Sequence, residues 1–419
     1  MCGFALESVN PCCKPGIGGD AAGGILKFIN RNLLLLFGCQ VIFVSGTVVL
    51  VTIGGLIGME LAPTPAIATL PVALMVVGTA AFTIPAAFSM QAWGRRRGFL
   101  LGISLAASGA LLAMTALSAA NFVLFCAGTT LMGASLAFSQ QFRFAAAESV
   151  APAYVSHAIS FLLMGSIVGA FVAPEIIAFS AAASTAAPYG QVFGIIVGLY
   201  AVAACLVFGF KPVEVVGETE AELDRPFASV IRQPIFITAV LAGMVGQGVM
   251  TYVMTATPIS MNVSDGFSIQ ETSEVIRAHV IAMYLPSLIT PLLIGRFGLP
   301  RVMVVGVIAT AATLMIGLAG HHLLHYWWAL VLLGVGWNFL FVSGTTMLTQ
   351  AYRPAERFKA QACNDFSVFG ASAMASLLAG TVLHAFGWSW LLWSVVPALL
   401  VMLAALFWLN RVRTQTASA

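Results

Sequence analysis

Two oppositely charged side chains interrupt long apolar stretches of this sequence and could form an ion pair. Arg143 lies two residues after Gln141, and Asp365 directly follows Asn364, in segments that are otherwise almost wholly apolar. A charge at the centre of a bilayer costs about 2.5–3.5 kcal/mol on insertion scales, so each needs a partner or a function. Asp365 comes six residues after Lys359, which is about 9 Å along a helix, and we expect Arg143 at a similar depth. The alternative is neutralisation close to each residue, with Arg143 extending to the membrane surface.

Two further acids, Glu60 and Glu175, fall in or at the end of apolar segments. Either could bind a proton where burial favours the neutral carboxyl group. Both are therefore candidate proton-coupling sites, and the alternative for each is contact with interfacial water. No apolar segment carries the dense carboxylate cluster that a sodium site would need.

Neutral polar side chains and aromatic rings occur together in three apolar segments and could bind a planar, uncharged molecule. Gln247 and Thr251 are four residues apart, so they share one face of a helix. The alternative for each polar residue is a hydrogen bond to a neighbouring helix. The candidate ligand-binding residues are Gln141, Phe142, Gln247, Thr251, Tyr252, Trp337 and Asn338.

The composition requires a membrane environment. Of the 419 residues, 60% are hydrophobic and 8% are charged, and the mean hydropathy is +0.99. A soluble protein has about 25% charged residues, so these few charges could not cover a soluble surface. The sequence also lacks a phosphate-binding loop, a convergent catalytic set and a basic stripe for nucleic acid. We therefore expect a polytopic membrane protein that is not an enzyme and that binds no metal, cofactor or nucleic acid.

The apolar segments are long enough for twelve transmembrane helices, since a bilayer core of about 30 Å needs about 20 residues. Closed barrels are excluded because the segments do not alternate in steps of two. The expected spans are roughly 32–58, 67–90, 98–118, 122–145, 154–179, 190–210, 234–260, 277–295, 301–319, 326–351, 361–385 and 387–409.

The basic residues predict the orientation of these spans. With both termini in the cytoplasm, every one of the 18 Lys and Arg residues except Arg277 falls in a cytoplasmic segment or helix end. The predicted parts are a cytoplasmic tail (1–31), a six-helix bundle (32–210), a cytoplasmic linker (211–233), a second six-helix bundle (234–410) and a second cytoplasmic tail (411–419).

The two predicted bundles resemble each other. Gly94 and Gly298, which follow the second and eighth spans, are 204 residues apart. Pro152 and Pro354, which follow the fourth and tenth spans in similar Pro-Ala contexts, are 202 residues apart. A parallel duplication of six helices places a pseudo-twofold axis along the membrane normal, with a binding site midway between the halves.

The turn after the second span carries a recognisable motif. Gly94, Arg95 and Arg96 match the end of the pattern Gly-x-x-x-Asp-Arg-x-Gly-Arg-Arg, and with twelve spans in two sixes the chain resembles the major facilitator superfamily. Gln91 and Ala92 stand where the Asp-Arg pair is expected, so the gating role of that pair is not carried over. The alternative role of the loop is a topology anchor, because its arginines cannot cross the bilayer.

The resemblance, which covers roughly residues 32–410, implies an all-α fold with two pseudo-symmetric six-helix bundles and secondary transport by alternating access. In that architecture the fourth and fifth spans face the tenth and eleventh at the cytoplasmic gate. It therefore implies that Arg143 and Asp365 approach each other when this gate closes. The residues expected to assist them are Glu148, Arg353 and Glu356.

The expected substrate is a small organic solute, and the amide and aromatic residues favour a heteroaromatic metabolite or vitamin of the riboflavin type. The alternative is a drug/proton antiporter, because Gly165 to Gly169 partially resembles the Gly-x-x-x-Gly-Pro pattern of such proteins, with Ala170 in place of the proline. Close helix packing is the other interpretation of those glycines. We expect a monomer in contact with lipid in the cell inner membrane. We expect its transport to be driven by a proton gradient or another gradient.

Overall fold

Long apolar helices form the architecture of the chain. The computed structural model describes residues 28–64, 67, 70–183, 188–213 and 226–418, and all regular structure within them is helical. Helices suit a membrane because every backbone N–H and C=O group within them is satisfied internally. The first group of helices, the N half, comprises α2 (Arg31–Leu61), α3 (Leu70–Ser118), α4 (Phe122–Ser139), α5 (Phe142–Glu148), α6 (Val155–Ala183) and α7 (Pro188–Gly209). The second group, the C half, comprises α9 (Pro234–Ile259), α10 (Ile269–Tyr284), α11 (Thr290–Phe297), α12 (Leu299–Ala319), α13 (Leu323–Leu348), α14 (Arg357–Trp393) and α15 (Val396–Ser418).

The described helices contain twelve membrane spans. Nine helical stretches are long and apolar enough to cross a bilayer, and the bent pair of α10 and α11, which turns by 49°, raises the number to ten. With 49 residues, α3 is about 70 Å long, more than twice the thickness of the bilayer core, and Gly94 divides it into two spans. The 62-residue stretch Pro354–Gln415 is divided in the same way at Gly387. The predicted twelve-helix fold class is confirmed.

The sequence repeat corresponds to repeated backbone geometry. Gly94 has φ 80° and ψ 161°, and Gly298 has φ 82° and ψ 158°. This conformation is essentially restricted to glycine because a Cβ atom would be strained there. Short 3₁₀ turns occur at Pro152–Tyr154 and at Pro354–Glu356, again at equivalent places in the two halves. The same turns therefore connect the same spans in each half.

Two expected segments differ in detail from the structure. The eighth span, expected at 277–295, begins earlier, at Ile269, because Ser268 and Glu271 form a reciprocal capping box there. The expected linker at 211–233 contains the short helix α8 (Phe227–Ile231). Much of that linker and nearly all of the first tail lie outside the described residues, so the domain boundaries stay a prediction.

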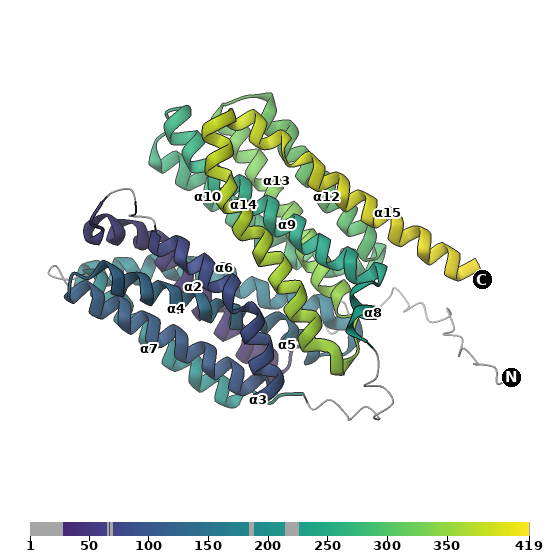
Figure 1. Cartoon of the computed structure of the whole chain (residues 1–419), viewed down its shortest axis with the longest axis horizontal. Coiled ribbons are helices and arrows are strands. Elements are labelled where there is room, and N and C mark those ends of the chain that lie inside the picture. The colour runs from purple at the N-terminus through teal and green to yellow at the C-terminus, as the bar shows by residue number, and fades with distance from the viewer. Residues whose placement is uncertain (1–27, 65–66, 68–69, 184–187, 214–225, 419) are drawn as a thin grey trace, which may run out of the picture.

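The two halves lie side by side and come together around α5 and α14 (Figure 1). The long helix α3 packs along α14 across the boundary between the halves, which we call the seam. Near α5 the halves interlock, because Phe144 of the N half packs in the core of the C half and Phe358 of the C half packs in the core of the N half. We call this end of the seam the arginine end, since Arg95, Arg143 and Arg357 lie there, and the opposite end the far end.

Candidate functional site

An ion pair between Arg143 and Asp365 crosses the seam at the arginine end. The Nη2–H group of Arg143 donates to Asp365 Oδ1, and the two side chains are 3% and 1% exposed. Gln141 Nε2 donates to Asp365 Oδ2 over 2.9 Å, and Asn364 Nδ2 donates to Oδ1 over 2.9 Å. The carboxylate therefore accepts hydrogen bonds from both halves. Of the two interpretations of these charges, the structure has the pair that joins the halves; its role in gating stays a prediction.

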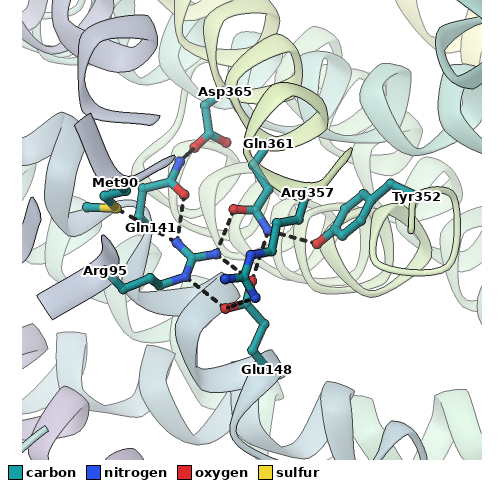
Figure 2. A network of polar contacts seen from close by, with 8 residues as sticks. All are labelled: Met90, Arg95, Gln141, Glu148, Tyr352, Arg357, Gln361 and Asp365. Atoms are coloured by element: carbon teal, nitrogen blue, oxygen red, sulfur yellow. Dashed lines mark hydrogen bonds and ion pairs between the residues drawn. The ribbon is translucent and has the colours of Figure 1, made fainter. Parts of the chain in front are cut away.

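A second arginine forms the centre of a larger network next to this pair (Figure 2). Arg95 Nε donates to Glu148 Oε2 over 2.8 Å, and Nη1 donates to Gln141 Oε1 over 3.1 Å. Its Nη2 group donates to Gln361 Oε1 in the C half over 2.8 Å. Because Gln141 donates in turn to Asp365, the two arginine-centred pairs are joined into one hydrogen-bonded network.

The C half adds further contacts at the outer edge of the network. Arg357 Nη1 lies 3.6 Å from Glu148 Oε2, so this carboxylate, which is 20% exposed, is shared by two arginines. The guanidinium carbons of Arg95 and Arg357 lie 5.0 and 4.8 Å from the centroid of the Phe358 ring. Gln361 Nε2 donates to the hydroxyl of Tyr352 over 2.8 Å. Tyr352 lies between α13 and α14, and burial raises the pKa of its phenol.

The loop motif and the remaining gate candidates lie around this network. The turn at Gly94 places Arg95 in the buried network, while Arg96 lies over the ring of Phe208, 5.5 Å from its centroid. Arg353 and Glu356 form the turn before α14, where the Arg353 backbone N–H group donates to Glu356 Oε2 over 2.9 Å. Arg95 therefore has contacts across the seam in addition to any role as a topology anchor.

A cavity of about 240 Å³ adjoins Arg143 and is lined by both halves. Its lining residues include Gln40 of α2 in the N half and Gln247 of α9 in the C half. Its C-half wall carries Trp337 stacked on Phe341, with ring centroids 4.8 Å apart and planes 16° apart. Trp337 Nε1 donates to Gln247 Oε1 over 2.7 Å. The cavity thus combines a pair of stacked aromatic rings with several neutral hydrogen-bonding groups.

The candidate ligand-binding residues divide between the cavity and other positions. Gln247 and Trp337 line the cavity. Gln141 belongs to the arginine network and Phe142 packs on Phe43 and Phe99 in the N-half core, so neither lines it. Gln140 and Gln141 form the turn between α4 and α5, and Gln140 rather than Gln141 lines the cavity.

The other three candidates hold helices together. Thr251 Oγ1 lies 2.7 Å from Ser372 Oγ of α14, and the Tyr252 hydroxyl lies 3.0 Å from Ser394 Oγ. Asn338 is fully buried, and its Nδ2 group donates to Met283 O and Ser287 Oγ, each over 2.7 Å. Asn338 therefore satisfies the polar groups freed where α10 gives way to the 3₁₀ turn Leu285–Leu288. None of the three lines the cavity.

The two acids proposed for proton coupling are both exposed. Glu60 lies at the end of α2, away from the cavity. Glu175 of α6 shares a hollow of about 290 Å³ with Arg277 of α10, towards the far end of the seam. Their coupling role stays a prediction.

Several cavity residues were not among the candidates. These are Gln40, Gln140, Ser166, Tyr284 and Phe341, and Gln40 Nε2 donates to Ser166 Oγ over 3.0 Å. A glutamine within the apolar α2 was a visible signal for one of them. Tyr284 and Phe341 carried no such signal, because aromatic residues in membrane helices are common. Within the described ranges, no three His, Cys, Asp or Glu side chains gather in a way that could hold a metal ion.

The glycines of α6 pack closely against α2. A Cβ atom added at Gly169 would lie 2.7 Å from Val41 O and 2.9 Å from Val44 Cβ. A Cβ atom at Gly165 would lie 3.2 Å from Phe37 O. The backbones of the two helices approach each other closely at these positions, as expected for small residues four apart.

Two six-helix halves with a cavity between them define a membrane carrier. The family model described as Major Facilitator Superfamily matches residues 35–290 and 256–419. The chain therefore belongs to the major facilitator superfamily, as the resemblance predicted, and it is a secondary transporter, not an enzyme.

Known relatives cover nearly the whole chain. The riboflavin transporter RfnT of Brucella anthropi is 36% identical over 378 residues, which cover 90% of this chain and 95% of that protein. The uncharacterized MFS-type transporter YddS of Bacillus subtilis is 27% identical over 85% of each chain. Among solved structures, the E. coli fucose:proton symporter FucP has a TM-score of 0.70 at 18% identity, covering 92% of this chain and 99% of that chain. A bacterial homologue of the iron transporter ferroportin has a TM-score of 0.72 at 14% identity, covering 91% and 100%.

Proposed function

We propose that this chain carries a planar heteroaromatic vitamin of the riboflavin type across the cell inner membrane, with the central cavity as its binding site. The observation that carries the proposal is the stacked pair of Trp337 and Phe341 beside the amides of Gln40, Gln140 and Gln247. Aromatic side chains at a binding site favour a flat ring system, and amides match the mixed donors and acceptors on the edge of such a ring. The 36% identity to a protein named as a riboflavin transporter supports the same substrate class.

The network at the arginine end acts, in this proposal, as the latch that closes one side of the carrier. Its hydrogen bonds join α3 and α5 to α14, and they must break before the halves can separate at that end. The distribution of the basic residues supports a cytoplasmic position for this end and for both termini. Transport then proceeds by rocking of the halves about the cavity, driven by a proton gradient or another gradient.

Riboflavin uptake tests the substrate. The full chain is expressed in a bacterial strain that cannot make riboflavin and lacks its own importer. We expect growth at low riboflavin and uptake of labelled riboflavin well above the empty-vector control. Protein present in the membrane without any such uptake contradicts the proposal, and an efflux susceptibility panel run in parallel identifies a drug exporter.

Two tryptophans of α13 offer a matched comparison for the binding site. Trp337 lines the cavity, whereas Trp328 is 51% exposed on the outside of the bundle. We expect Trp337→Ala to lower riboflavin uptake at least about tenfold, because stacking and pocket shape are both lost. Trp328→Ala should leave uptake within about twofold of the parent. Equal effects of the two changes would remove the cavity from the proposal.

A further inference from the structure

We propose that Arg143 binds the transported molecule directly, by donating to an acceptor oxygen on the edge of its ring, and so links occupancy of the cavity to the latch. The ligand class is a planar heteroaromatic ring that carries carbonyl oxygens. This inference rests on the proposed function for the ligand, whereas the assignment of Arg143 depends on three features of its surroundings.

The first feature is an unused donor. Within the described residues, the buried Nε–H group of Arg143 donates to no acceptor. Its Nη1 group has only the distant Gln140 Oε1 at 3.5 Å, while Nη2 donates to Asp365. An unsatisfied donor on a buried charged group is costly, and a ligand oxygen that accepts from it recovers that free energy.

The second feature is the fixed orientation of the guanidinium group. Its central carbon lies 4.8 Å from the centroid of the Phe144 ring and 4.7 Å from that of Phe341. The rings cover its faces, so the group can form hydrogen bonds only along its edges. Arg143 donates to Asp365 from one terminal nitrogen and also lines the cavity.

The third feature is the shared wall. Arg143, Trp337 and Phe341 all line the cavity, and Phe341 contacts both the guanidinium group and the Trp337 ring, so the arginine and the aromatic pair border the same space. A flat ring bound in this cavity can turn one edge towards the arginine. Carbonyl oxygens on that edge, as in the pyrimidine-dione part of a flavin, are suitable acceptors.

This arrangement gives binding a mechanical consequence. Arg143 serves both the ligand and Asp365, so an acceptor in the cavity competes for the charge that holds α5 to α14. Ligand binding then weakens one bond of the latch and favours opening at the arginine end. Such a shift can be no larger than the difference in ligand affinity between the closed and open states.

Riboflavin binding to the purified full-length protein, followed by quenching of the vitamin's own fluorescence, tests the assignment. We expect Arg143→Gln to weaken binding at least about tenfold, since a hydrogen bond to a charged donor is lost. Asp365→Asn breaks the same ion pair but leaves the arginine in place, so its binding should stay equal to the parent or become tighter. Arg97→Gln, at an exposed arginine of the same end, is the control and should bind as the parent does.

Equal weakening by Arg143→Gln and Asp365→Asn would overturn the proposal, because it would mean that Arg143 acts only through the latch. Unchanged binding by Arg143→Gln would overturn it as well. If the parent protein binds no riboflavin, the proposed function itself fails. If the parent binds riboflavin but the Arg143 variants give either contrary result above, only the assignment of Arg143 fails.

A conservative variant and a ligand change guard against a folding defect. Arg143→Lys keeps the positive charge opposite Asp365 but loses the planar fork and the Nε–H group. We expect the Arg143→Lys variant to have the same unfolding temperature as the parent but to bind riboflavin several-fold more weakly. The 2-thio and 4-thio analogues of riboflavin replace one carbonyl oxygen by sulfur, a weaker acceptor. We expect the parent to bind at least one of these analogues more weakly than riboflavin. Arg143→Gln should bind that analogue and riboflavin with equal affinity. An equal loss of affinity for the analogue in both proteins would contradict direct contact.

Discussion

The two ends of the seam are built differently. At the arginine end, Arg95, Arg143 and their partners join the halves through hydrogen bonds and ion pairs, and a phenylalanine from each half packs in the core of the other. At the far end, Glu175 and Arg277 face one hollow from opposite halves, and within the described part of the chain no hydrogen bond or ion pair joins them.

This difference defines the state of the carrier. Opposite charges in a medium of low polarity attract strongly, so pairs formed at one end stabilise closure there. The unpaired charges at the other end can meet only when that end closes. The two sets of charges are therefore expected to stabilise alternate states, and each can be tested separately.

The largest effect is expected from leaving one charge of the buried pair without its partner. Asp365→Leu leaves Arg143 buried and uncompensated, which should destabilise the protein by about 3–5 kcal/mol. The double change Arg143→Met with Asp365→Leu should recover most of that loss, because apolar side chains of similar size often replace a buried pair without cost. Thermal unfolding in detergent measures both; a double variant as unstable as the single one would contradict the pairing.

The shared carboxylate at the arginine end is expected to have the next largest effect. Glu148→Gln removes the negative charge that Arg95 and Arg357 share and replaces one acceptor oxygen by an amide donor, a loss of about 1.5–3 kcal/mol in charge-assisted hydrogen bonds. The arginine end should then open more often. We expect a cysteine placed at buried Thr346, in a cysteine-free background, to react about tenfold faster with a water-soluble thiol reagent. Glu60→Gln, at an exposed acid, is the control and should leave the rate unchanged.

Glycine turns separate backbone effects from the polar contacts of each end. Gly94 lies at the arginine end. Gly387, which has φ 79°, connects the last two spans at the ends that are away from the arginine end. An alanine at either position should cost about 1–3 kcal/mol of stability because the backbone conformation is nearly restricted to glycine. Transport per folded molecule should fall only for Gly94→Ala, which displaces Arg95. An equal fall for Gly387→Ala would mean that the arginine network is not what distinguishes the two ends.

The smallest effect is expected at the far end, where the charges are exposed. Glu175→Gln or Arg277→Gln should slow transport only several-fold, as for a partly screened pair of about 1 kcal/mol. The exchange Glu175→Arg with Arg277→Glu should restore the rate, since the attraction is kept with its direction reversed. Uptake assays measure all three; an exchanged variant slower than either single variant would contradict a pair that forms on closure.

Much of the fold could be predicted from the sequence because the membrane restricts it. The number of spans follows from their length and hydrophobicity, and the repeat follows from Gly94 and Gly298 at a fixed offset. The same reasoning identified Arg143 and Asp365 as a possible pair, because a charge at that depth needs a partner and few candidates exist. The break of the eighth span after Tyr284 was not predicted, since its polar groups are satisfied by the distant Asn338.

By itself, the sequence determined which parts of this protein lie in lipid, which ends carry the positive charge and which charged residues must find partners, since these depend on composition and spacing along the chain. Only the tertiary structure decided that Gln141 donates to Asp365 while Gln140 lines the cavity. It also decided that Arg95 reaches Gln361 across the seam and that Phe341 covers Arg143. These are contacts between helices far apart in the chain. They depend on the rotation and approach of each helix, which an almost uniformly apolar sequence does not encode locally.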